Sequence, residues 1–324
     1  MTRTSQVAGA TLLLASALVV TLTGASYPAA LSQKQAVQTV VHYGKTDTKA
    51  SATYNIGLQN AVEEGIEARQ DDSNFSLLSR AAAASITAGA TPSVANITVY
   101  LTGSSKTPAE FLATIPEPAT NGSNPSPAYT WYGVFRKDSK KTAWRLDFGV
   151  AILATNLPGS VTMTSGKAQI QSAAPRYGLV TLVNYLTAGQ GNVAPSPNAN
   201  SWYATDQQVA GSYANSGIAV GLKFTVDRSP VTSIEVSGGS LEFGGIDEVS
   251  TERASSGVQC VAANQSNTSE YLTLVPPGIQ YQQIQVDTLI QVSLFVPSNQ
   301  SQPVHLLSLQ AQLMSANTPP CPAT

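Results

Sequence analysis

Ile284-Gln-Val-Asp-Thr-Leu-Ile-Gln-Val-Ser-Leu-Phe-Val296 is the stretch that decides the fold of this chain. Its apolar side chains recur at every second position, which is the period of a β-strand whose alternate residues share a face. That face carries Ile284, Val286, Ile290, Val292, Leu294 and Val296, and only Thr288 interrupts it. The pattern predicts a long strand with one face against a hydrophobic core.

Alternating stretches on either side extend this strand into a sheet. A last strand is expected over 306–314. Residues 218–226 also alternate, and the turn residues Asp227-Arg228-Ser229-Pro230 are expected to return the chain along 231–236. Two shorter strands are expected over 241–243 and 246–249.

The first half of the chain has strands of its own. Residues 96–101 alternate, and 111–115 form an apolar run of strand length. Residues 129–136 and 142–152 flank Lys137-Asp138-Ser139-Lys140-Lys141, whose polar residues indicate a hairpin tip. A second antiparallel sheet is therefore predicted.

Apolar residues at helical spacing precede the strands in each half. The helices expected in the first half cover 33–43, 54–66 after an N-cap at Asp47-Thr48, and 75–84 after Ser73 or Asn74. Those expected in the second half run from Pro175 to Thr187 and over 206–213, with a Gly/Pro/Asn/Ser loop over 189–201 between them.

Each half thus has helices first and an antiparallel sheet after them, which is an α+β plan with helices on one face of a curved sheet. The region 156–166, with Pro158, Gly159 and Gly166, marks the boundary. The expected domains are 31–158 and 167–324, preceded by a leader over 1–30. The repeat is one of element order, since the residues themselves do not repeat convincingly.

The leader predicts export. Arg3 supplies a positive charge, and Thr11-Leu-Leu-Leu-Ala-Ser-Ala-Leu-Val-Val20 supplies an apolar run that is short for a membrane-spanning helix, which needs about 20 residues. Leu22, Thr23 and Gly24 resemble the residues that precede a lipid-modified cysteine, but Ala25 stands where the cysteine would be.

Three interpretations of this leader stay open. Signal peptidase could cut after Ala25 or after Ala30, since small residues precede both positions. The leader could instead remain as an anchor, which its length disfavours. In the third interpretation, Ala25 replaces a lipidated cysteine. Any membrane association would therefore come from the leader alone.

Composition excludes some functions. The 324 residues are 42% hydrophobic and only 11% charged, with a formal net charge of −2. A protein that binds nucleic acid through phosphate contacts needs a basic surface, so no nucleic-acid partner is expected. Cys260 and Cys321 are the two cysteines, and in an oxidising compartment they are expected to pair. Two independent free thiols are the alternative.

No catalytic, cofactor or metal signature stands out. The two histidines, His42 and His305, are the sole candidates for a Ser–His–acid triad, and no nucleophile elbow occurs. Two isolated histidines and two distant cysteines lack zinc-ligand spacing, and no phosphate-binding glycine loop is present. Neither a cofactor nor a metal site is predicted.

Carboxylates are the remaining candidates for chemistry. The adjacent acid pairs Glu63/Glu64, Asp71/Asp72 and Asp247/Glu248 are expected to be solvated, because neighbouring side chains diverge and a glycosidase needs two carboxyls facing one another across a cleft. Asp147 lies on an otherwise apolar strand. It is expected to pair with Arg145 or Arg136 at the sheet surface rather than to act as a general base.

Several motifs together resemble a family of actinobacterial cell-envelope lipoproteins that carry a domain of unknown function. They are Tyr54-Asn-Ile-Gly-Leu-Gln-Asn-Ala-Val-Glu63, Asn96-Ile-Thr-Val-Tyr100, Ala143-Trp-Arg-Leu146, the strand 221–226, Pro276-Pro-Gly278 with Tyr281, Leu289-Ile-Gln-Val-Ser-Leu-Phe-Val-Pro297 and Leu306-Leu307. The resemblance implies an exported protein with tandem cystatin-like or nuclear-transport-factor-2-like halves. Ala25 departs from the pattern of a lipidated member.

These observations favour an exported bacterial cell-envelope protein that is a binding or structural module and not an enzyme. A small-molecule or enzymatic pocket in one cone-shaped half is the first alternative, with Trp131, Tyr132, Trp144 and Trp202 as candidate wall residues, although core packing suits most of them. A partner in envelope assembly is the second alternative, which an exposed apolar patch would indicate. The expected partner is thus an envelope protein or a small ligand.

Overall fold

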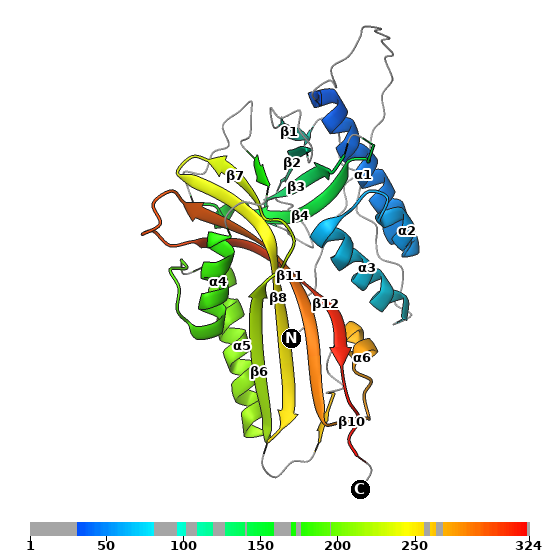
Figure 1. Ribbon diagram of the computed structural model, residues 1–324, viewed down its shortest axis with the longest axis vertical. Helices are drawn as coiled ribbons and strands as arrows, with labels where there is room; N and C mark the ends of the chain where they lie inside the picture. The colour runs from blue at the N-terminus through cyan, green and yellow to red at the C-terminus, as the bar shows by residue number, and fades with distance from the viewer. Residues whose placement is uncertain are drawn as a thin grey trace.

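A computed structural model describes residues 31–80, 96–101, 109–118, 127–139, 141–158, 170–172, 176–194, 196–255, 260–263 and 268–322. Within them the chain is mixed α+β, with antiparallel sheets and helices packed against the sheets (Figure 1), as the sequence predicts.

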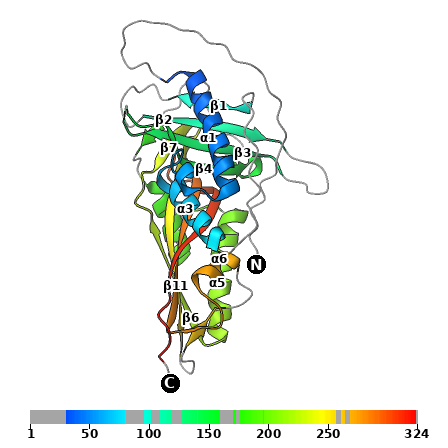
Figure 2. The same cartoon turned by 90° about the vertical axis from the view of Figure 1, so that its right-hand side faces the viewer.

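The first sheet contains four antiparallel strands in chain order. These are β1 (Thr98–Leu101), β2 (Ala109–Glu117), β3 (Tyr129–Lys137) and β4 (Arg145–Leu153), followed by a 3-10 turn, η2 (Ala154–Asn156). Helix α1 (Gln33–Thr53) lies across these strands (Figure 2). Ala36 and Val40 of α1 are fully buried in a core cluster with Phe111 and Phe135 of the sheet. The strands expected at 96–101, 111–115, 129–136 and 142–152 are therefore confirmed, with shifted ends.

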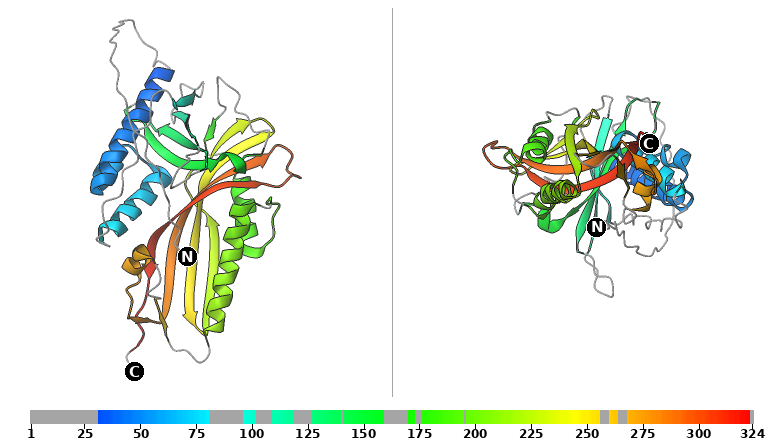
Figure 3. Two further views of the ribbon diagram at one scale, coloured as in Figure 1. Left: turned by 180° about the vertical axis from the view of Figure 1, so that it is seen from behind. Right: turned by 90° about the horizontal axis from the view of Figure 1, so that it is seen from below.

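The second sheet is built around the predicted long strand. Its strands are β12 (His305–Asn317), β11 (Gln283–Pro297), β8 (Gly239–Ala254), β7 (Thr232–Val236) and β5 (Ile170–Ser172), paired in that order, while β6 (Ile218–Val226) also pairs with β8. Helices α4 (Tyr177–Ala188) and α5 (Pro197–Asn215) cover one face, with α5 alongside β6 (Figure 3).

Both faces of β11 are buried over its second half. Ile290, Val292 and Leu294 face the core under α4 and α5, whereas Leu289 and Phe295 belong to the core shared with the first sheet. The sequence predicted one buried face, and the structure buries the other as well.

The pairing expected for β6 is wrong. β6 was expected to form a hairpin with 231–236, but it pairs with the second half of β8, where Val226 lies opposite Ile246. β7 pairs with the first half of β8, where Thr232 lies opposite Phe243. The turn 227–230 therefore carries the chain along one edge of β8, and Asp227 N donates to Gly245 O at 2.9 Å to hold the turn there. A local turn signal does not reveal which distant strand offers the better partner. The two strands expected at 241–243 and 246–249 are parts of the single strand β8.

The helix boundaries also differ from those expected. Helix α1 continues through Asp47-Thr48, and its N-cap is Ser32, whose Oγ accepts from Gln35 N at 3.3 Å. The helix expected over 54–66 is wrong at its centre, because α2 (Ile56–Gln59) is a single turn and α3 (Gly65–Arg80) begins after an irregular segment. Helix α3 therefore starts well before the expected caps Ser73 and Asn74.

In the second half, α4 is confirmed, with Pro175 outside the described residues. Helix α5 is longer than the predicted 206–213 and takes up part of the expected loop over 189–201. Three short elements had no clear sequence signal: α6 (Ser269–Leu274), β9 (Val261–Ala262) and β10 (Gln280–Tyr281). The last two pair with each other beside the Cys260–Cys321 disulfide.

The two expected halves share one hydrophobic core. Phe148 of β4 and Tyr132 of β3 contact Phe243 of β8, with ring centroids 5.3 Å and 6.3 Å apart. Leu289 and Phe295 of β11 belong to the same cluster as Val134 and Ile152 of the first sheet; the other buried members include Ile66, Leu112, Val150, Ile234, Leu241 and Leu307. The division into domains 31–158 and 167–324 stays a prediction.

Helix α3 connects the two sheets through polar side chains. Gln70 Nε2 donates to Leu289 O at 2.9 Å and to Gln310 O at 3.1 Å, and Ser73 Oγ donates to Leu313 O at 2.6 Å. Arg69 Nη1 lies 2.7 Å from Asp227 Oδ2. The carbonyls of the edge strand β12 thus accept hydrogen bonds from donors on the helix instead of facing solvent.

Gln70 is 2% exposed, so removing its amide leaves two carbonyls of the second sheet short of a donor. We expect Gln70→Ala to lower the free energy of unfolding by about 1–3 kcal/mol in a urea titration. Ser79→Ala, at the exposed end of the same helix, is the control, with an expected change within about 0.5 kcal/mol. Equal effects of the two substitutions would contradict the role given to Gln70.

Candidate functional site

Sharp turns between the helices of the first half bring α1, α2 and α3 together. Tyr54 adopts a left-handed conformation (φ 48°) that ends α1, and the Oδ1 of Asn55 accepts from Leu58 N at 2.9 Å to begin α2. Gly65 also has positive φ (61°), at a place where a Cβ would collide with the Asp147 carboxylate. These sharp reversals set α3 against α1, with the irregular segment 60–64 between them.

The result is a group of carboxylates that we call the acidic cluster: Asp47 on α1, Glu63 before α3 and Asp71 on α3. Each offers an oxygen within 4.8 Å of the others. Gln59 of α2 lies among them, and its Nε2 is 3.0 Å from Asp47 Oδ1 and 2.8 Å from Asp71 Oδ2 and also donates to Glu63 Oε1. Three segments of the chain therefore converge on one amide nitrogen.

Tyr43 fixes one side of the cluster. Its hydroxyl donates to Glu63 Oε1 at 3.2 Å, and its ring stacks on Trp131 of β3 with centroids 6.2 Å apart. The backbone of Glu63 is held as well, since Glu64 N donates to Leu146 O and Leu146 N donates to Val62 O, each at 2.8 Å. The carboxylate of Glu63 is thus positioned from the first sheet.

The electrostatics of this cluster are unfavourable to ionised carboxylates. Glu63 is 1% exposed, and none of the ion pairs within the described residues includes a member of the cluster. Burial, followed by the charges of Asp71, Glu67 and Asp47, raises the pKa of Glu63 well above its usual range. Burial and the Asp47 charge raise the pKa of Asp71, and burial raises that of Asp47.

Hydrogen bonding leaves the cluster incompletely satisfied. An amide nitrogen carries two hydrogens, and Gln59 Nε2 has three carboxylate neighbours. Glu63 Oε2 and Gln59 Oε1 are buried without a hydrogen-bond partner. Such a site can do two things chemically: take up protons, or hold a cation that prefers oxygen ligands.

Glu67, one turn after Glu63, joins the cluster to both sheets. Its Oε2 accepts from Gly149 N of β4 at 2.8 Å and from Gln291 Nε2 of β11 at 2.9 Å. Burial and the nearby charge of Asp71 raise the pKa of Glu67 to about 8, and these two hydrogen bonds oppose that rise.

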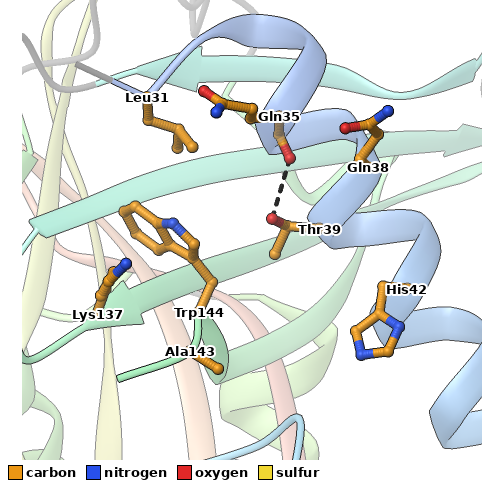
Figure 4. A pocket seen from close by; sticks show the side chains of 8 residues that line it. All are labelled: Leu31, Gln35, Gln38, Thr39, His42, Lys137, Ala143 and Trp144. Atoms are coloured by element: carbon orange, nitrogen blue, oxygen red, sulfur yellow. Dashed lines mark hydrogen bonds between the residues drawn. The ribbon is translucent and has the colours of Figure 1, made fainter. Parts of the chain in front are cut away.

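A cavity that opens to solvent lies elsewhere, at the start of α1. It has a volume of about 440 Å³. Its lining comes from α1 and the residue before its N-cap, from the end of β3 and from the β3–β4 connection, namely Leu31, Gln35, Gln38, Thr39, His42, Lys137, Ala143 and Trp144 (Figure 4). The Trp144 indole lies across from the helix. Its described lining includes no carboxylate.

The disulfide between Cys260 and Cys321 is confirmed, with Cα atoms 6.1 Å apart. It joins the C-terminal tail to β9, and Cys321 N donates to Gln280 O at 2.9 Å. The leader residues Leu22, Thr23, Gly24 and Ala25 lie outside the described residues. None of the helices in the described part of the chain combines the length and the hydropathy that a membrane span requires.

The histidines are not brought together. His42 lines the cavity at α1, and His305 packs against Phe295 with ring centroids 5.9 Å apart. Within the described residues neither forms an ion pair. Of the candidate wall residues, Trp202 and Tyr132 are buried in the core, while Trp144 lines the cavity.

Two expectations about carboxylates need correction. Asp147 does lie 4.0 Å from Arg136 Nη1, as predicted, but it is buried rather than at the sheet surface, and burial raises its pKa to about 6. Glu63 is buried rather than solvated. One signal could have revealed this site: Glu63, Glu67 and Asp71 recur at every fourth residue, which places like charges on one side of a helix at a cost.

Comparison with known protein families, characterised proteins and solved structures finds no match to this chain. The function must therefore be argued from its residues.

The raised pKa of Glu67 predicts a pH dependence of stability. Glu67 stays protonated in the folded protein up to about pH 8, whereas a glutamate in the unfolded chain ionises near pH 4.3. Its contribution to stability is complete below the unfolded pKa and is lost as the pH rises through the folded pKa. In metal-free buffer we expect the free energy of unfolding to fall between about pH 5 and pH 8, and Glu67→Gln to reduce that slope.

The control for this measurement is Glu235→Gln, which changes an exposed glutamate on β7 and is expected to keep the wild-type slope. A wild-type protein whose unfolding free energy is constant or rises across this range would contradict the assignment, as would an unchanged slope in Glu67→Gln.

Proposed function

We propose that this protein is an exported cell-envelope module without catalytic activity, related to the lipoproteins that its motifs resemble. The Cys260–Cys321 disulfide supports the proposal, since such bonds persist in oxidising compartments and are rare in the cytosol. The lipobox-like Leu22-Thr23-Gly24 and the apolar leader support it independently.

One observation favours a non-catalytic role: the carboxylates with raised pKa values do not line the cavity beside Trp144. Glu63, Glu67 and Asp71 have raised pKa values, but they lie where α3 packs against the other helices and the sheets, and they bond to groups of the fold itself. The cavity beside Trp144 has no carboxylate in its described lining. An active site needs titratable groups that line a pocket for substrate, and these residues do not meet that condition.

The proposal is tested by producing the chain with its leader in an actinobacterial host and fractionating the cells. We expect a processed protein in the envelope or medium, with both cysteines resistant to alkylation until a reductant is added. A cytosolic, unprocessed protein with two reactive thiols would contradict it. Introducing Ala25→Cys should add a lipid if the remaining residues of the leader are read as a lipobox.

A small-ligand module is a second candidate, which the cavity beside Trp144 favours. An indole face near the basic side chains of Lys137 and His42 suits an aromatic anion. The fluorescent probe 1-anilinonaphthalene-8-sulfonate is therefore expected to bind the folded protein, and Trp144→Ala is expected to weaken binding about tenfold or more.

Ile279→Ala serves as the matched control, because it removes an exposed apolar side chain near β10, far along the chain from this cavity. Equal binding by the wild-type protein and both variants would show that the probe does not use the cavity and would remove this candidate.

A further inference from the structure

Besides its charges, the acidic cluster contains a buried oxygen that lacks a hydrogen-bond partner. Glu63 is 1% exposed and directs a carboxylate into the cluster, yet its Oε2 has no hydrogen-bond partner. The carbonyl Oε1 of Gln59, which is fully buried, also has none. Buried polar oxygens are normally satisfied, so the Glu63 oxygen indicates a missing positive partner in the cluster.

We propose that the acidic cluster binds a calcium ion, with the carboxylates of Asp47, Glu63 and Asp71 and the amide oxygen of Gln59 as ligands. This site goes beyond the proposed function and does not rest on it.

The spacing of the oxygens fits the ion. Calcium binds oxygens at about 2.3–2.6 Å, so two ligands on opposite sides of it lie up to about 5 Å apart. The three carboxylates of the cluster offer oxygens within 4.8 Å of one another. An ion at their centre can therefore reach all three once the Gln59 amide, which now lies among them, withdraws from that position.

Gln59 occupies that centre with its Nε2, which contacts all three carboxylates. The two ends of a glutamine amide are nearly the same size, so rotating the group by half a turn exchanges Nε2 for Oε1. The unpartnered carbonyl oxygen would then face the cluster as a fourth ligand. The same residue thus has one orientation suited to the empty cluster and another suited to a cation.

The donor set selects the type of cation. All four ligands are oxygens, which favours hard ions such as calcium over zinc or copper. Asp47 and Asp71 are partly exposed, so water can reach the ion and complete a coordination shell of six to eight. Magnesium demands a stricter octahedron at shorter distances, which ligands from four separate segments meet less readily.

Binding would stabilise the fold. The ligands come from α1, from α2, from the irregular segment 60–64 and from α3, so an ion would tie these elements together. It would also neutralise carboxylates that otherwise repel one another. A ligand that binds the folded chain alone raises stability with the logarithm of its concentration.

The test is thermal unfolding of the full purified chain, in a chelator and then in increasing calcium chloride at constant ionic strength and pH. We expect the melting temperature to rise with the logarithm of calcium concentration, by roughly 4–5 °C when calcium exceeds its dissociation constant a hundredfold. Isothermal titration with calcium chloride should give about one site per chain. Magnesium chloride should give a smaller shift.

Two variants separate the site from general folding effects. Asp71→Asn and Glu63→Gln each remove a ligand charge, so they should lose the calcium response. In chelator they should melt at or above the wild-type temperature, because they relieve repulsion. Asp72→Asn is the matched control: it removes the neighbouring charge, which accepts from Asn60 Nδ2 at 3.0 Å outside the cluster, and it should keep the response.

Several results would overturn the proposal. A melting temperature that follows pH and does not respond to calcium would mean that protons alone neutralise the cluster. An equal calcium shift in the wild-type protein, Asp71→Asn and Glu63→Gln would place the ion elsewhere. A magnesium shift as large as that of calcium would remove the assignment to calcium.

Discussion

Helix α3 supplies hydrogen-bond partners to strands of two sheets that meet at one core, and the rest of the structure depends on this. Glu67 accepts from Gly149 N of β4, while Gln70 and Ser73 donate to carbonyls of β11 and β12. A buried backbone group without a partner costs free energy comparable to a lost hydrogen bond. A helix with a purely apolar inner face would therefore leave these strands unsatisfied. The polar residues of α3 bond to particular backbone groups of β4, β11 and β12, so they fix how the helix aligns with the strands of both halves.

This use of polar residues has an electrostatic consequence. The same helix brings Asp71 and Glu67 toward Asp47 and Glu63, and Arg69 pairs instead with Asp227 at the turn before β7. The acidic cluster is left with a glutamine amide as its main donor. Carboxylates in that setting are neutral or need a cation, because ionised groups in the interior without compensation are costly. The fold and the proposed calcium site are therefore two results of one arrangement.

Local pattern predicted much of the secondary structure, and the misses have physical causes. Strand β11 was evident because alternation is a property of consecutive residues. The strand that pairs with β6 could not be predicted in the same way, because the second half of β8 comes beside β6 only when the chain folds. Asp47 and Ser73 suit a helix start in isolation, but tertiary packing placed both inside helices. The acidic cluster was missed since the expectation of solvated acids holds for single helices, and here three segments converge.

We infer that α3 makes the two sheets one cooperative unit. Native-state hydrogen exchange with mass spectrometry tests it most directly, because it reports the free energy at which each segment opens. We expect the amides of β4, α3 and β11 to share the highest protection and to lose it together as denaturant is added. If β1–β4 with α1 opened at a clearly lower free energy while β8, β11 and β12 stayed protected, the claim would be contradicted.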